Sequence, residues 1–274
     1  MSNFIHGDNL YHKIDIEKNS NNRKLLREIK TSYEKWKQDN LKIAGTNESD
    51  IKNKVKLLND YKTFIEQPQF KKEAGNRLGF TSQSQLHSSV LEEFMYYLFK
   101  DIGKLRGKNI NWGRTKAYTN LYFAPPNIDK LEEKSNIVVN VKDQDFSISK
   151  EIVLKSRVSN NQNWQENSIY VPIVSIECKT YLDKTMYEGS VSTAEKIKRG
   201  NPYCMFIIVT ESYEVSLDVD PKYSQIDQVY VLRKDDKNGS IYPDVVCDLF
   251  KLVESHINSD WYNVRERIKK GKMI

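Results

Sequence analysis

The segment from Val171 to Met186 ends an apolar run with a carboxylate, a thiol and an ammonium group in succession. Its sequence is VPIVSIECKTYLDKTM, and the three groups belong to Glu177, Cys178 and Lys179. Successive side chains of a strand point to opposite faces, so Glu177 and Lys179 share a face while Cys178 points into the core. A carboxylate there can bind a hard cation such as Mg²⁺, and a neighbouring lysine can orient water or offset charge on a phosphate.

One carboxylate rarely holds Mg²⁺ well, so a second acid is expected near Glu177. Asp145 begins the segment DFSISKEIVL, which has the alternating pattern of a strand. If this strand runs antiparallel to the strand that carries Glu177, Asp145 lies opposite Glu177 despite their separation in sequence. Asp143 and Asp129 are the alternatives for the same role.

A third acid can come from the helix predicted for residues 82–105, whose wide apolar face indicates deep packing. Glu92 and Glu93 stand among its apolar residues, and we expect Glu92 to turn towards the metal and act through a water. A solvated helix face is the alternative interpretation of the two glutamates. For Glu177 and Lys179 the alternative is an ordinary ion pair that closes a strand.

The elements that must position these residues follow from hydrophobic periodicity. Helices are predicted at residues 22–38, 48–67, 82–105, 192–199 and 244–269. Strands are predicted at residues 117–125, 136–142, 145–154, 169–179, 203–210 and 227–234, with a polar loop at 155–168. This order predicts a mixed α/β fold, with one central sheet flanked by helices. We expect a helical N-terminal subdomain at residues 1–80 and a core with C-terminal helices at 81–274.

The composition is that of a globular protein with a mild basic bias. The chain has 274 residues, 38% of them hydrophobic and 29% charged, and a net charge of +6. No apolar run approaches the roughly 20 residues of a transmembrane helix, and no secretory signal is evident at the N-terminus. The three scattered cysteines are expected to be reduced and buried. These features predict a cytoplasmic protein without a membrane partner.

Three polar or basic stretches have side chains suited to nucleic acid. They span residues 104–118, 155–168 and 192–201. Lysine and arginine can neutralise phosphates, and arginine can contact guanine edges. Plain exposed loops are an equally good interpretation of these stretches. The candidates for DNA contact are Arg106, Lys108, Arg114, Lys116, Arg157, Lys196, Lys198 and Arg199.

Asp145, followed by the string IECK within this order of elements, resembles the PD-(D/E)xK nuclease superfamily, as found in type II restriction endonucleases. The longer string ECKTYLDKTM, with KDQDF upstream, is similar to one subunit of the heterodimeric BbvCI-like restriction endonucleases. Gln144 stands where the name of the superfamily places a proline, which keeps the choice of the first acid open.

The resemblance implies a bacterial enzyme that hydrolyses phosphodiester bonds of double-stranded DNA at a short specific site, with Mg²⁺ as cofactor. Asp145 and Glu177 would hold the metal, and Lys179 would assist the attacking water. It also implies that each subunit cuts one strand and that a homologous second subunit completes a heterodimer, with an asymmetric site of the CCTNAGC type. A homodimer is the alternative when the chain is alone.

Two other functions are compatible with the same residues. The first is a structure-specific DNA repair or recombination nuclease of the same fold. The second is a DNA-binding subunit whose acidic pocket is inert. Cleavage of ordinary duplex DNA at fixed positions, and its loss on substitution of Glu177 or Lys179, separates these functions from the restriction enzyme.

Overall fold

The computed structural model describes residues 2–70, 85–105, 110–159, 161–216, 219–234 and 236–271. In chain order the elements are α1 (Ile5–Ile16), α2 (Ser20–Lys42), α3 (Glu48–Ile65), η1 (Pro68–Phe70), α4 (Gln85–Phe99), α5 (Ile102–Leu105), β1 (Asn111–Phe123), α6 (Ile128–Glu133), β2 (Ile137–Ser156), β3 (Gln165–Leu182), α7 (Lys184–Gly200), β4 (Met205–Tyr213), η3 (Pro221–Tyr223), β5 (Gln228–Val231), α8 (Pro243–Asn258) and α9 (Val264–Lys269). The predicted α/β class with a helical N-terminal region is confirmed.

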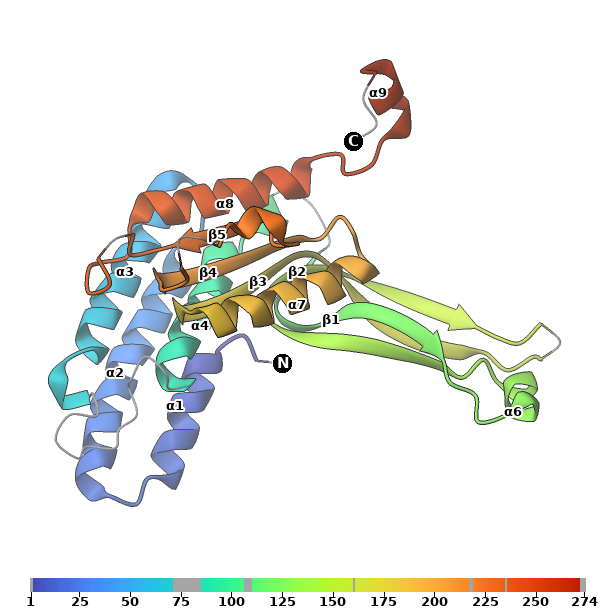
Figure 1. Cartoon of the computed structure of the whole chain (residues 1–274). Coiled ribbons are helices and arrows are strands. Elements are labelled where there is room, and N and C mark those ends of the chain that lie inside the picture. The colour runs from blue at the N-terminus through green and yellow to red at the C-terminus, as the bar shows by residue number, and fades with distance from the viewer. Residues whose placement is uncertain are drawn as a thin grey trace.

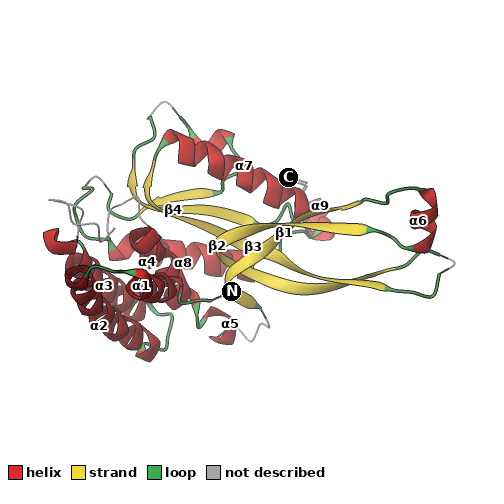
Figure 2. Cartoon of the chain, turned by 90° about the horizontal axis from the view of Figure 1, so that it is seen from below, coloured by secondary structure: helices red, strands yellow, loops and turns green. Residues whose placement is uncertain are grey.

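A mixed five-stranded sheet with the order β1-β2-β3-β4-β5 forms the centre of the molecule. Neighbouring strands are antiparallel from β1 to β3 and parallel from β3 to β5. Helices α1 to α4 and α8 lie on one face of the sheet, and α7 lies on the other (Figure 2). The strands that carry the candidate catalytic residues are therefore held between two helical layers.

Two apolar cores correspond to these two layers. The larger core joins α1, α2, α3, α4 and α8 to the sheet, where Phe146, Ile176 and Cys178 contribute. The smaller core lies under α7 and includes Ala194 and Ile197. The first three helices thus share one continuous core with the sheet.

Strands β1, β2 and β3 extend beyond the helices as an arm with α6 at its tip (Figure 1). Strand β2 folds back on itself, because its first half pairs with β1 and its second half with β3, and both halves run out along the arm. A straight strand of 20 residues would hold its ends roughly 60 Å apart. Here the hydroxyl of Ser135, just before β2, lies 2.9 Å from that of Ser156 at its end. Register shifts in both pairings accommodate the bend.

A buried carboxylate on α4 fixes the start of α1. Glu93 accepts hydrogen bonds from the backbone N–H of His6 at 2.9 Å and of Gly7 at 3.2 Å. Its other oxygen accepts from the hydroxyls of Tyr33 at 2.9 Å and Tyr97 at 2.5 Å. Four donors thus surround one buried carboxylate, which joins α1, α2 and α4.

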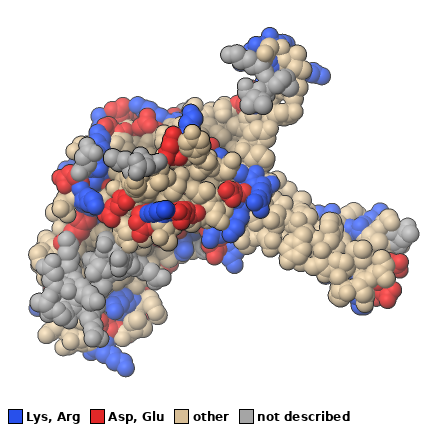
Figure 3. Space-filling view, viewed as in Figure 1, with Lys and Arg blue, Asp and Glu red and all other residues tan. Residues whose placement is uncertain are grey.

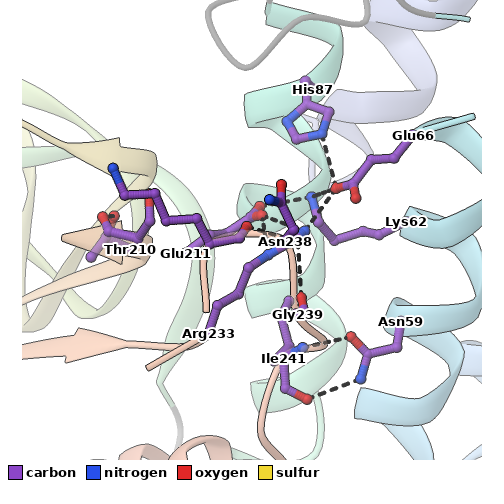
Figure 4. Close-up of polar contacts among 12 residues, drawn as sticks. Asn59, Lys62, Glu66, His87, Thr210, Glu211, Arg233, Asn238, Gly239 and Ile241 are labelled. Atoms are coloured by element: carbon purple, nitrogen blue, oxygen red, sulfur yellow. Dashed lines mark hydrogen bonds and ion pairs between the residues drawn. The ribbon is translucent and has the colours of Figure 1, made fainter. Parts of the chain in front are cut away.

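A second cluster of charged side chains joins α3 to β4 and to the segment that follows β5 (Figure 4). The Nζ atom of Lys62 lies 2.7 Å from a Glu211 carboxylate oxygen. Arg233 lies 2.7 Å from Glu66 and 2.9 Å from Glu211. Burial favours the neutral form of Glu66, yet a hydrogen bond with His87 and the charges of Lys62 and Arg233 hold its pKa below the usual value. The cluster therefore depends on charges supplied by distant parts of the chain.

The structure corrects the predicted strands around Asp145. The strands predicted at 136–142 and 145–154 form a single strand, β2, so Asp145 lies within a strand and does not begin one. The polar residues Asp143 and Gln144 between them suggested a break, but the backbone continues to pair with β1 there, with Asp143 exposed and Gln144 buried. Part of the predicted loop at 155–168 is also strand, because β2 and β3 continue into the arm.

The helices also differ from prediction. The segment predicted as one helix at 82–105 contains α4 and α5, and α6 was not predicted. Helix α1 was missed because its buried side consists of only His6, Gly7 and Leu10. Helix α7 begins at Lys184, earlier than predicted, where the Asp183 side chain accepts from the N–H of Met186 and caps it. The predicted C-terminal helix ends at residue 258, and Asn263 caps a separate short helix, α9.

Candidate active site

Glu177 and Lys179 lie near the end of β3 and share a face, as predicted. The Nζ atom of Lys179 is 3.7 Å from a carboxylate oxygen of Glu177. Between them, Cys178 is buried in the larger core beside Ile176. The buried side chains of Ile176 and Cys178 anchor this part of β3 in the larger core.

Asp145 lies next to this pair because β2 and β3 are antiparallel. Phe146 pairs with Ile176, so the adjoining residues Asp145 and Glu177 stand opposite each other. The backbone N–H of Cys178 donates to Asp145 at 2.9 Å. Burial raises the pKa of Asp145, and the nearby Glu177 adds to the rise, against the opposing effects of the Cys178 N–H and of the Lys179 charge. The charge of Glu177 is thus close enough to disfavour ionisation of Asp145.

Ser190 on α7 is a member of the site that the sequence did not reveal. Its hydroxyl donates to the Glu177 carboxylate oxygen that also lies nearest Lys179. The side chain is buried at 1% exposure. A serine one helical turn after Met186 carries no local signal of such a role, because the contact exists only once α7 has packed on the sheet.

Glu92 reaches the same place from α4. Burial raises its pKa to about 7, helped by the charge of Asp145 and opposed by Arg114 and Lys179. Its carboxylate lies 3.8 Å from Nε of Arg114 on β1. Glu93 turns instead into the buried cluster that fixes α1. The preference for Glu92 over Glu93 therefore agrees with the placement of both side chains.

The alternatives to Asp145 lie elsewhere. Asp129 is on α6 at the tip of the arm, where β3 begins, and so lies at the opposite end of β3 from Glu177 (Figure 1). Asp143 is exposed and pairs across the sheet with Lys116 on β1. Asp145 is therefore the aspartate that the fold brings to Glu177.

The donor set fits a hard divalent cation. Among the described residues, no group of three or more His, Cys, Asp or Glu side chains is arranged to hold a metal ion. Mg²⁺ is commonly bound through one or two carboxylates, with water and substrate phosphate completing its shell. Asp145 and Glu177 supply two facing carboxylates, and a cation between them would offset the burial and the Glu177 charge that raise the pKa of Asp145.

Two of the predicted DNA-contacting residues lie beside this group. Arg114 contacts Glu92, and Lys116 follows it on β1; both line one groove. Arg157 lies at the far end of the arm, 4.8 Å above the ring of Trp164. Arg106 and Lys108 fall outside the described residues.

The remaining candidates lie near the C-terminal end of α7. Lysine and arginine side chains gather there, where the arm joins the body (Figure 3). Lys196 and Arg199 are exposed. Lys198 is held by an ion pair with Asp227 at 2.7 Å, so its charge is already partly neutralised.

Comparison with known proteins identifies the family. The sequence profile described as the Bpu10I restriction endonuclease matches residues 83–242, which carry the carboxylates and the lysine described above. The chain belongs to the Bpu10I restriction endonuclease family. It is therefore a type II restriction endonuclease, a hydrolase that acts on double-stranded DNA, and divalent metal ions are the general cofactors of the Bpu10I family and related enzymes.

The fold of this Bpu10I-family chain resembles a solved structure described as the native BbvCI A2B2 tetramer at low resolution. The two share 18% sequence identity, with a TM-score of 0.69 over 94% of this chain and 97% of the other. This likeness confirms the restriction-endonuclease-like core. No curated protein matched the chain. In the described part of the chain, none of the helices has the length and apolar character needed to cross a bilayer.

Proposed function

We propose that the chain is one subunit of a Mg²⁺-dependent type II restriction endonuclease that cuts one strand of a short specific site. The observation that carries this proposal is the convergence of Asp145, Glu177 and Lys179 at one end of the β2–β3 pair. We further propose an asymmetric recognition site, of the CCTNAGC type.

Asp145 and Glu177 would hold Mg²⁺, which supplies a Lewis acid that stabilises the charge developing on the attacked phosphate. Ser190 and the N–H of Cys178 each fix one of these carboxylates. The ammonium group of Lys179 has three donors and lies 3.7 Å from Glu177, so it can orient a water towards the phosphorus. Glu92, with a pKa of about 7, can hold a proton of that water at neutral pH.

We also propose that a homologous second subunit cuts the opposite strand. The support is the solved structure of similar fold, which is described as an A2B2 tetramer, together with the single group of catalytic candidates in the described residues of this chain. One such group accounts for one cut. Without its partner subunit, the chain would nick DNA or act as a homodimer.

The test is a supercoiled plasmid assay with Mg²⁺. Wild type and Lys179→Ala are compared, each alone and with the product of the neighbouring gene, and Lys184→Ala serves as control because Lys184 is exposed on α7. We expect wild type and the control to cut at one fixed sequence. Lys179→Ala should lose about a hundredfold or more in rate while still binding DNA.

Each result has a distinct meaning. Cutting only by the pair of proteins supports the heterodimer, and nicking by this chain alone supports one cut per subunit. Cleavage of branched or flapped DNA with no cleavage of plasmid would replace the restriction enzyme by a structure-specific nuclease. Equal activity of wild type and Lys179→Ala would remove Lys179 from the mechanism.

A further inference from the structure

A groove of about 460 Å³ lies at the base of the arm, beside the candidate active site. Its wall includes Arg114, Thr115 and Lys116 from β1, Ser147 from the bend of β2, and Tyr170 from β3. The volume falls within the roughly 300–1,000 Å³ of typical ligand sites. The folded-back course of β2 creates this concavity, because β1 and β3 approach each other where β2 bends, as the pairing of Ala117 with Tyr170 shows.

The groove has the chemistry of a phosphate site. Among the described residues that line it there are two cations and no carboxylate. Lys116 is exposed and makes no ion pair within the described part of the chain. Arg114 has only a long contact, at 3.8 Å, to Glu92, and its Nε has no hydrogen-bond partner among the described residues. Both cations therefore have donors left for an anion.

Neutral donors complete the wall. Thr115 and Tyr170 add hydroxyl groups. Ser147 is buried at 0% exposure, and within the described residues its hydroxyl has no hydrogen-bond partner. A buried hydroxyl without a partner costs free energy, and a phosphate oxygen or a water held by that phosphate would satisfy it.

The groove also lies at a suitable distance from the reacting centre. Ser147 follows Asp145 by two residues on β2, which is roughly 7 Å along a strand. Successive phosphates of one DNA strand rise about 3.4 Å along the helix axis. A phosphate in the groove would therefore lie near the scissile phosphate, as a neighbour on the same DNA strand does.

We propose that this groove binds a backbone phosphate next to the scissile one, with Lys116 and Arg114 as its cations and Ser147 as a neutral donor. The proposal rests on the proposed nuclease function, because it assigns a further substrate contact to the same enzyme. The bound phosphate would set the register of the DNA strand on the catalytic carboxylates. The scissile phosphorus would then lie next to the water that Lys179 orients.

The test compares Lys116→Met with Lys142→Met. Both lysines are exposed on the paired strands β1 and β2, and Lys142 faces Ala117, the neighbour of Lys116, but lies outside the groove. Binding to a labelled duplex of about 30 base pairs is measured without divalent metal across a series of salt concentrations. Sequence-independent phosphate contacts are sufficient for this measurement, so the recognition site need not be known.

We expect Lys116→Met to reduce the slope of log K against log salt by about 0.9, the value for one phosphate contact. Lys142→Met should leave the slope unchanged. Ser147→Ala should weaken binding about threefold to tenfold without changing the slope, since it removes a neutral donor. Thermal melting of each variant checks that the fold is retained.

Equal slopes for Lys116→Met and wild type would overturn the proposal. So would equal losses in Lys116→Met and Lys142→Met, which would indicate diffuse charge rather than a site. If the wild type cuts plasmid but the variants give either of these results, the proposed function stands and the groove does not. If the variants give the expected slopes but the wild type does not cut, the groove stands and the proposed function does not.

Discussion

At the scale of single residues, the carboxylate of Glu177 is held from two sides. Ser190 donates to one of its oxygens, and Lys179 lies 3.7 Å from the same atom. This arrangement leaves the other oxygen for a metal. A ligand oriented in this way binds its metal more tightly, because no free energy is spent on fixing its rotamer.

Ser190→Ala should therefore weaken the response to metal more than the response to DNA. We expect the Mg²⁺ concentration for half-maximal cutting to rise about tenfold or more, with KM for DNA nearly unchanged. Ser190→Thr keeps the hydroxyl and should recover most of the activity. The measurement is the cleavage rate across a magnesium titration.

Ser192→Ala is the control, because Ser192 is exposed two residues further along α7. A uniform loss in all conditions for Ser190→Ala, or failure of the threonine variant to recover activity, would mean that Ser190 only packs against the sheet.

The sequence was informative about the residues whose positions depend on one strand or one strand pair. Glu177 and Lys179 share a face by strand alternation, and Asp145 meets Glu177 by simple antiparallel pairing. Ser190 and Arg114 could not be assigned in the same way. Their contacts with Glu177 and Glu92 depend on how separate elements pack, and neither has a local pattern that records it.

At the scale of elements, α4 carries one glutamate to the active site and the next to the core. Glu93 holds four donors that come from α1, α2 and α4. Burial raises the pKa of Glu93, and the surrounding donors oppose the rise. The position of Glu92 therefore depends on the anchoring of Glu93 one residue away.

Glu93→Ala should lower the free energy of unfolding by about 3 kcal/mol or more, because it leaves several buried donors without an acceptor. Urea denaturation measures the change. Glu28→Ala is the control, since Glu28 is exposed on α2 and its removal should have little effect. An equal effect of the two substitutions would show that the buried cluster contributes no net stability.

Element boundaries were harder to predict than element types. The type of β3 and of β4 was clear, because apolar runs that are covered on both faces leave a strong signal. The course of β2 was not, since its bend is set by pairing with two different strands and not by its own residues. Helix α1 has a weak pattern because polar contacts through Glu93 replace part of its apolar face.

At the scale of the whole molecule, the N-terminal helices and the sheet form one core. The buried cluster of Lys62, Glu66, Glu211 and Arg233 adds charged contacts between α3 and the sheet. The division at residue 80 stays a prediction about chain organisation. The shared core indicates that both parts unfold together.

Arg233→Met should destabilise the whole molecule by about 3–5 kcal/mol, because it leaves the buried carboxylate of Glu211 and the partly buried one of Glu66 with one cation fewer. Within each protein, wild type or Arg233→Met, we expect circular dichroism and tryptophan fluorescence to report the same urea midpoint. That midpoint should be lower in Arg233→Met. Lys251→Met is the control: its pair with Glu48 also joins α8 to α3, but on the surface, so the midpoint should hardly move.

Two separate transitions in wild type would instead show that the helices before residue 80 form an independently stable unit. A change in Arg233→Met no larger than that in Lys251→Met would show that the buried cluster is replaceable.

The folded-back course of β2 gives the arm a mechanical property. Its two legs are continuous with the peptide that carries Asp145, and Asp145 is tied to β3 through the N–H of Cys178. A force on the tip of the arm, whether from DNA or from another subunit, would be transmitted along both halves of β2 to its bend. The arm thus acts as a lever that pivots at Asp145, the candidate metal-binding carboxylate. Shortening the arm without moving Asp145 requires equal deletions from all four of its strand segments.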